Sequence, residues 1–153
     1  HQVLKSLMLE AFKLEEEGYI GDEDNGSLSA WFVLSSLGIY AVTPGTDQYV
    51  LGISIWDQAR LNLSDGQSFQ WTTLNPSQVL NVVLSRQLNG RDYAAHFLTY
   101  EDIMAGGQLE QELGLLPSIK PLEASLRPFS LALNDQREYN SLDCKIEEEA
   151  HGN

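Results

Sequence analysis

Apolar residues recur at helical spacing at the start of the chain. Within residues 2–16 they lie three or four positions apart, in a stripe made by Val3, Leu4, Leu7, Met8, Ala11 and Phe12. A stripe of this kind predicts an amphipathic helix with one face in a core. Gly18 follows the acidic run of residues 15–17 and is the residue expected to end this helix.

A second helix is predicted over residues 27–37, where the apolar side chains fall on nearly every side. Gly38 ends the run, and Pro44-Gly45 marks a turn. A helix that is apolar all round is expected to be buried all round. One hairpin of two helices cannot bury it, so we expect further packing partners outside these 153 residues.

The pattern changes to that of strands after Pro44. Strand candidates fall at residues 49–53, 59–63, 68–71, 79–84 and 108–113. Asp65-Gly66 and Asn89-Gly90 are tight-turn pairs, which favour antiparallel neighbours. Thr99, followed three residues later by Asp102, predicts a short capped helix that Gly106-Gly107 would close.

Helices followed by mostly antiparallel strands predict an α+β fold, or pieces of two domains. A hydrophobic content of 42% is typical of a globular protein. The net charge of −13 argues against nucleic acid as a partner, because phosphates would be repelled. No apolar run is long enough to span a bilayer, and the single cysteine, Cys144, allows no disulfide within the chain.

The loop between the two predicted helices carries the candidate chemistry. Asp22, Glu23 and Asp24 lie in a row between glycines, at the mouth of an apolar helix. Such a run of acids is costly unless it meets a cation, solvent or a substrate. Asp22 and Asp24, two apart in an extended loop, would face the same way, and Glu23 would face the other way into solvent. The pair suits a general base, but a simple helix cap would use the same residues.

The segment GDEDNGSLSAWFVLSSLGIYAVTPGTDQYVLG resembles the C-terminal signature of glycoside hydrolase family 92, the calcium-dependent, inverting exo-α-mannosidases. The family shows a G-[DN]-x-D-x-G-x-x-S-A-W segment followed by G-x-Y-x-V-x-P-G. The matching positions are Gly21, Asp22, Asp24, Gly26, Ser29, Ala30, Trp31, Gly38, Tyr40, Val42, Pro44 and Gly45. A second matching patch runs through residues 88–90, 100–104 and 106–107, so the resemblance covers about residues 1–115.

The resemblance implies a domain arrangement. Residues 1–45 would be the last helical hairpin of an α/α toroid, and residues 46–115 would add strands to a β-sandwich. From about Leu116 the family pattern fades, and residues 116–153 are expected to form a divergent, weakly ordered tail or a short helix. The resemblance also implies removal of terminal α-linked mannose from glycans, with Asp24 as the general base and Asp22 helping to place the water. Calcium and the general acid would be held mainly by residues upstream of this chain.

Other candidate residues favour structural roles. The spacing after Asp22 does not fit a self-contained EF-hand, because Val33 stands where the closing glutamate belongs. The tryptophans and histidines are expected to pack or to lie on the surface rather than to bind sugar or metal. They are Trp31, Trp56, Trp71, His1, His96 and His151. Cys144 has no histidine nearby, so a nucleophilic role is not expected.

The sequence thus predicts the C-terminal part of a mannosidase whose N-terminal part lies outside this chain. The resemblance also implies an extracellular or periplasmic location. Two alternatives stay open on the residues alone. One is a non-catalytic carbohydrate-binding or structural β module, and the other is a truncated pseudoenzyme.

Overall fold

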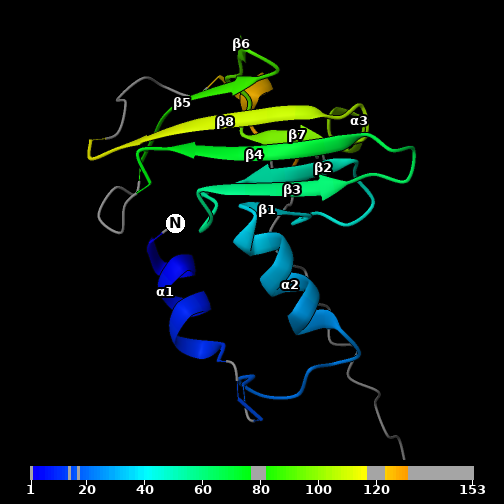
Figure 1. Cartoon of the computed structure of the whole chain (residues 1–153), viewed down its shortest axis with the longest axis vertical. Helices are drawn as coiled ribbons and strands as arrows, with labels where there is room; N and C mark the ends of the chain where they lie inside the picture. Colours follow the sequence, from blue (N-terminus) through cyan, green and yellow to red (C-terminus); the bar gives the residue numbers. More distant parts are fainter. Residues whose placement is uncertain (1, 14, 17, 77–81, 117–122, 131–153) are drawn as a thin grey trace, which may run out of the picture.

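The computed structural model describes residues 2–13, 15–16, 18–76, 82–116 and 123–130. Two helices come first, strands follow, and a short helix interrupts the strands before the last of them (Figure 1). The helices are α1 Gln2–Ala11, α2 Ser27–Ser36 and α3 Tyr100–Met104, with a single 3-10 turn, η1, at Ala124–Leu126. The strands are β1 Ile39–Tyr40, β2 Gln48–Leu51, β3 Gln58–Asn62, β4 Ser68–Leu74, β5 Val82–Leu88, β6 Arg91–Asp92, β7 Phe97–Thr99 and β8 Gly107–Gly114.

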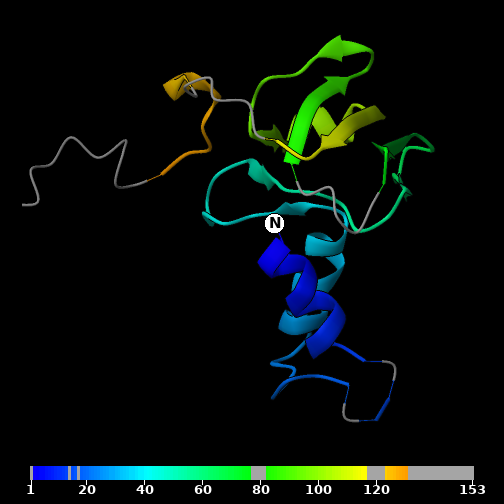
Figure 2. The same ribbon diagram turned by 90° about the vertical axis from the view of Figure 1, so that its left-hand side faces the viewer.

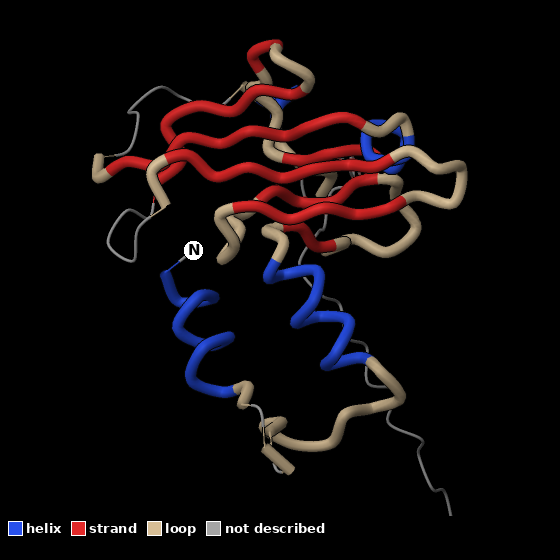
Figure 3. The backbone as a smooth tube through the Cα atoms, in the orientation of Figure 1, coloured by secondary structure: helices blue, strands red, loops and turns tan. Residues whose placement is uncertain are grey.

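The α1–α2 pair and the strands form two separate parts. The two helices project together from one side of the strand layers in both views of the ribbon (Figures 1 and 2). This arrangement agrees with the predicted α+β class and with helices followed by strands (Figure 3). The strands form a three-stranded sheet in the order β1-β2-β7 and a five-stranded sheet in the order β3-β4-β8-β5-β6.

One strand pair departs from the antiparallel prediction. β4 and β8 run parallel, with Phe69 opposite Gly107 and Leu74 opposite Glu112, whereas the other pairs among the described strands are antiparallel. Local turn signals determine only hairpins between consecutive strands. β8 instead lies between β4 and β5 in the sheet, although β6, β7 and α3 precede it in the chain. Its direction therefore depends on pairing between distant segments, which turn residues do not determine.

The hydrophobic core draws on both sheets and on α3. Its buried members are Ile39, Leu51, Phe69, Trp71, Leu98, Ile103 and Leu109. In β4 the burial alternates strictly, so that Phe69, Trp71 and Thr73 point inward. The rings of Phe69 and Trp71 meet edge to face at 4.7 Å between centroids. The prediction that Trp71 packs in the core is confirmed, whereas Trp56 is half-exposed.

The predicted turn and cap signals are confirmed. Asp65 lies in the β3–β4 turn, where its Oδ1 accepts from Gln67 N at 2.9 Å. Asn89 and Gly90 adopt left-handed φ values of 52° and 74° between β5 and β6. Thr99 and Asp102 form a reciprocal capping box at the start of α3. These features depend on neighbours in sequence, and so the sequence predicts them well.

α1 ends earlier than predicted, whereas α2 has the predicted bounds to within one residue. α1 ends at Ala11 rather than near Gly18, and the Lys13 N–H donates to the Gly18 carbonyl at 3.0 Å, which closes a loop instead of another helical turn. Among the residues of α2, only Ser36 is buried, and Val33 is 55% exposed. This exposure agrees with the expectation that one hairpin of two helices cannot bury α2. The packing partners expected outside these 153 residues stay a prediction.

The tail prediction for residues 116–153 falls largely outside the described residues. The described part, residues 123–130, lies against the three-stranded sheet. His96 N donates to the Leu126 carbonyl at 2.9 Å, and Phe129 N donates to Gln48 Oε1 at 2.7 Å. The division at residue 45 stays a prediction, although β1 pairs with β2 across it.

The last turn of α2 is bonded to the segment that follows β2. The Ser36 carbonyl accepts from Ile55 N at 3.0 Å and from Ser54 Oγ at 3.1 Å, while Ser36 Oγ accepts from Trp56 Nε1 at 3.1 Å. These bonds satisfy groups at a helix end that would otherwise lack partners. Gly52 N donates to the Gly38 carbonyl at 2.7 Å. The helix is thereby fixed to the strands at its C-terminal end.

A buried arginine ties the second sheet to the same segment. Arg86 of β5 is 8% exposed, and its Nη2 donates to the Gly52 carbonyl at 3.3 Å. Burial lowers the pKa of Arg86 to about 10, with the nearby Tyr93 opposing the shift. The guanidinium therefore stays charged at neutral pH. Gly52 thus connects the five-stranded sheet, through Arg86, to the end of α2, through Gly38.

Gly38→Ala should destabilise the fold more than Gly45→Ala does. Both glycines have left-handed φ values, 78° and 86°, so both substitutions carry the conformational cost of about 1–2 kcal/mol. A Cβ at Gly38 would also lie 2.7 Å from Ser54 N and 2.8 Å from the Ile53 carbonyl carbon, whereas one at Gly45 meets nothing within 4 Å. The crowding should add about 1–3 kcal/mol at Gly38. Urea unfolding midpoints measure the difference, and equal losses in the two variants would contradict the contact between α2 and the strands.

Candidate functional site

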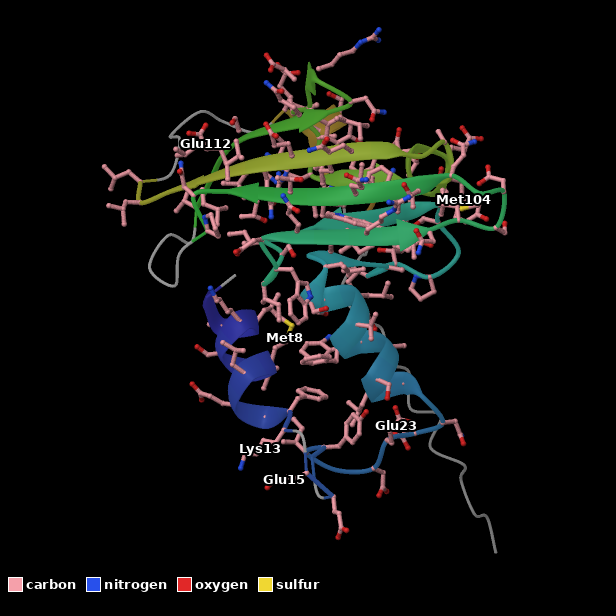
Figure 4. The ribbon with its side chains drawn as sticks, viewed as in Figure 1. Met8, Lys13, Glu15, Glu23, Met104 and Glu112 are labelled. Carbon is pink, nitrogen blue, oxygen red and sulfur yellow. The ribbon has the colours of Figure 1, made fainter. Side chains whose placement is uncertain are left out.

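The acidic loop connects α1 to α2 at the end of the helix pair that points away from the sheets. The labelled Glu23 marks this end of α2, and Lys13 and Glu15 mark the facing end of α1 (Figure 4). Lys13 and Glu15 form an exposed ion pair of 3.5 Å, which contributes little to stability. Asp22 and Asp24 are exposed, and Glu23 is half-buried.

Glu23, not an aspartate, caps α2. Its Oε1 accepts from Ser29 N at 2.9 Å, and its Oε2 accepts from the Gly26 N–H. Gly26 is the N-cap residue and provides no side chain for the task. Hydrogen bonds from Ser29, through its side chain first and then its backbone, lower the pKa of the Glu23 carboxyl, and the Gly26 amide adds to this against a small effect of desolvation. The expectation that Glu23 faces solvent is therefore wrong.

The loop is not extended at Asp24. Asp24, Asn25 and Gly26 have consecutive left-handed φ values of 53°, 58° and 93°, and Ser27 N donates to the Asp24 carbonyl at 3.3 Å. Aspartate and asparagine tolerate this region better than other residues that carry a Cβ. The argument from alternation, that residues two apart face the same way, does not apply to such a turn. The turn bonds the Glu23 carbonyl to Leu28 N at 3.3 Å and brings the Glu23 side chain back over the helix end.

The carboxylates of Asp22 and Asp24 have no hydrogen-bonding partner among the described residues. Neither side chain makes a hydrogen bond or an ion pair with any residue that the structure describes. The simple explanation of these acids as helix caps therefore does not hold, because Glu23 already fills that role. Their oxygens are available to a water molecule, a cation or a substrate hydroxyl. The sequence-based role of the pair as catalytic residues stays a prediction.

Aromatic side chains hold the two helices together beside the loop. The Phe12 ring stacks on Trp31 at 5.5 Å and lies 5.0 Å from Phe32 and 5.7 Å from Tyr19, measured between centroids. The Tyr19 hydroxyl lies 2.8 Å from Ser29 Oγ, in hydrogen-bonding contact. Trp31 thus packs between the helices, as the sequence predicts. The same cluster links the acidic loop to α2, since Ser29 also donates to Glu23.

An apolar hollow lies away from the acidic loop. It has a volume of about 250 Å³ and lies between the helices and the three-stranded sheet. Its lining includes Leu4, Met8, Trp31, Ile39 and Val50, and no residue of the acidic loop. Met8 marks its place near the strands, at the opposite end of the helix pair from Glu23 (Figure 4). The apolar hollow and the candidate catalytic acids are therefore separate features.

The described residues do not form a metal site by themselves. Within the described ranges, no group of three or more histidine, cysteine, aspartate or glutamate side chains could hold an ion. His1, Cys144 and His151 lie outside these ranges. His96 is exposed, and desolvation, together with the charge of Arg86, lowers its pKa.

The profile of the glycosyl hydrolase family 92 catalytic domain matches residues 1–115. The chain belongs to this family. No curated protein matches the chain. Among solved structures, it is similar to the family 92 inverting mannosidase of Bacteroides thetaiotaomicron VPI-5482, with 28% identity and a TM-score of 0.76 over 86% of this chain. It is also similar to a family 92 α-mannosidase of Bacteroides thetaiotaomicron solved with mannoimidazole, with 24% identity and a TM-score of 0.77 over 85% of this chain.

The chain spans 18% and 17% of the lengths of these two structures. It therefore corresponds to a small part of such an enzyme. None of the helices in the described residues is both long enough and apolar enough to cross a membrane. The acidic loop falls within the region that the family profile matches, which places Asp22 and Asp24 in a family 92 segment.

Removal of the Glu23 carboxylate should loosen the start of α2, and acid should have the same effect. The folded-state pKa of Glu23 is lowered, so its stabilising effect is present above the carboxyl's usual pKa and is lost as the pH falls through the folded-state value. We expect faster amide hydrogen exchange at Gly26 and Ser29 in Glu23→Ala than in the wild type, and Glu23→Gln should lie between them because an amide retains one acceptor oxygen. Asp22→Ala is the matched control and should leave these amides protected. Equal exchange in Glu23→Ala and the control would show that Glu23 does not cap the helix.

Proposed function

We propose that this segment supplies the general base of a family 92 exo-α-mannosidase, which removes terminal α-linked mannose from glycans with inversion. The observation that supports the proposal most is the unengaged state of Asp22 and Asp24 in a family-matched loop whose capping role Glu23 fills. The similar solved structure of an inverting mannosidase favours the same reaction class.

In the proposed reaction, a water molecule attacks the anomeric carbon from the face opposite the leaving oxygen. Inverting glycosidases need one carboxylate to take a proton from this water and a carboxylic acid to protonate the leaving group. Asp24 is the proposed base, and Asp22 holds the water in line through a second hydrogen bond. The general acid is expected outside this chain. A base must be ionised to accept a proton.

The left-handed turn fixes the backbone of the proposed base, Asp24. Because Asp24 lies in a three-residue turn rather than in an extended strand, its side chain is held by a backbone that Glu23 bonds to α2. A carboxylate on such a fixed turn can be positioned without its own hydrogen bonds to protein groups. Its oxygens then stay free for water, which a general base requires.

Calcium and location are further parts of the proposal. Calcium would bind mainly through residues upstream of this chain, where it would help to orient the sugar hydroxyls. Asp22 and Asp24 have the hard oxygen ligands that this ion prefers, but the described residues alone do not complete a site. An extracellular or periplasmic location is proposed from the family resemblance alone.

Asp24→Asn should lower kcat by at least about 100-fold in a family 92 catalytic domain that contains this segment, because asparagine cannot accept the proton. The folded state should lose little stability, since the Asp24 carboxylate makes no hydrogen bond to another described residue. Asp22→Asn should lower kcat by less. Steady-state hydrolysis of an aryl α-mannoside measures both variants. Near-wild-type turnover in Asp24→Asn would reject Asp24 as the base.

The 153-residue chain alone should not hydrolyse an aryl α-mannoside. The proposed general acid lies upstream of this chain, so no group would protonate the leaving oxygen. The chain should also bind a dye that detects exposed apolar surface. Leu9 and Val33 of the two helices are 60% and 55% exposed, and Leu4 is 45% exposed. Hydrolysis by the chain alone, or dye-silent cooperative unfolding of a monomer, would contradict this expectation.

A further inference from the structure

A shallow hollow is lined by residues of β4, of the β5–β6 turn and of the start of β8. β8 begins next to α3 (Figure 1). The hollow has a volume of about 360 Å³. It is lined by Ser68, Gln70, Asn89, Gly90, Gly107 and Gln108. Ser68 and Gln70 flank the buried Phe69, and Gln108 precedes the buried Leu109, so these polar side chains belong to the face opposite the core.

The floor of this hollow is held by backbone contacts. Asn89 N donates to the Gln108 carbonyl at 2.8 Å, and Asn89 Oδ1 accepts from Gln108 N at 2.8 Å. Gly107 has a φ of 115°, and a Cβ there would collide with the Asn89 side chain. The β5–β6 turn is therefore locked against the start of β8. The hollow is a preformed feature of the sheet rather than a gap between loose side chains.

The side chains that line the hollow include hydrogen-bond donors and acceptors, and none of them is charged. Gln108 Nε2 donates to Thr72 Oγ1 at 3.1 Å, and Asn89 Oδ1 is engaged as described. The Ser68 hydroxyl and the Gln70 amide make no hydrogen bond to other described residues. Together with the Asn89 NH₂ group they supply donors and acceptors within one small area. A charged ligand would lose hydration here without meeting an opposite charge in the lining, whereas a neutral ligand with adjacent hydroxyls would find matched partners.

We propose that this hollow binds a neutral sugar residue of a glycan at a place separate from the acidic loop. The choice of mannose as the sugar rests on the proposed function. The hollow lies on the strand part of the molecule, whereas the acidic loop lies at the far end of the helix pair (Figure 1). The lining has no aromatic side chain on which a sugar ring could stack, so binding is weak, with a Kd of about 1 mM.

Titration of the ¹⁵N-labelled 153-residue chain with methyl α-D-mannoside tests the proposal by NMR. Saturable shifts are expected at the amides of Gly90, Gly107 and Gln108. The double variant Ser68→Ala with Gln70→Ala should bind about tenfold more weakly, because two neutral hydrogen bonds are lost. Gln58→Ala is the matched control, since Gln58 lies on the same sheet face opposite Thr72, is exposed and does not line the hollow. Its affinity should equal that of the wild type.

A second variant keeps the test decisive if the double variant loses its fold, which the indole signal of the buried Trp71 reports. Gln70→Glu has the same shape but removes a donor and adds charge, and it should weaken binding as well. Absence of saturable shifts at about 100 mM mannoside, a hundredfold above the expected Kd, would overturn the proposal. Stronger shifts of the same amides by inorganic phosphate would also overturn it. Because none of these readouts involves hydrolysis, a failed titration leaves the role of Asp24 standing, and a failed Asp24→Asn test leaves the hollow standing.

Discussion

The anchoring of α2 at its C-terminal end is the constraint on which the rest of this structure depends. Ser36 and Gly38 bond to residues 52–56, and Arg86 brings the second sheet to the same segment. The helix then carries the acidic loop about 15 Å away at its other end, at 1.5 Å per residue over ten residues. Because α2 is fixed to the strands at its C-terminal end, the acidic loop at its N-terminal end has a defined position. The hydrogen bonds described for the loop involve no strand residue.

The three acids of the loop divide two tasks between them. Glu23 satisfies the open amides of the helix start, and this bonding explains the lowered pKa of its carboxyl. Asp22 and Asp24 make no such bonds, and the proposed function assigns the water and its proton to them. A loop with three similar side chains thus contains one acid that stabilises the structure and two that remain available. The distinction depends on the left-handed turn at residues 24–26, which brings Glu23 back over the helix.

The sequence predicted those features that depend on near neighbours. Asn89-Gly90, Asp65-Gly66 and the Thr99–Asp102 capping box all behave as expected, because turns and caps are determined within four residues. Pairing between distant segments was not predictable in this way, and the parallel register of β4 with β8 is the clearest case. The short strands β1, β6 and β7 have two or three residues each, too few to show a period of two.

The geometry predicted for the acidic loop was wrong, whereas the catalytic roles of Asp22 and Asp24 stay a prediction. The family resemblance identified the loop, and the family profile confirms that this loop lies in a family 92 segment. The alternation rule then misplaced Glu23, since it assumes an extended backbone, whereas residues 24–26 are three consecutive left-handed residues. Known capping patterns place the acid at the N-cap or three residues after it, whereas Glu23 lies three residues before Gly26, so no pattern in the sequence signalled its capping role.

The most direct test of this division of tasks is a paired measurement of kcat and of the urea unfolding midpoint in Glu23→Gln and Asp24→Asn, made in a family 92 catalytic domain that contains this segment. The account predicts opposite effects. Glu23→Gln should lower the unfolding midpoint and retain most of the turnover, while Asp24→Asn should retain the midpoint and lose the turnover. If both variants lose stability and activity in parallel, the three acids act as one structural unit, and the assignment of Asp24 as the general base is wrong.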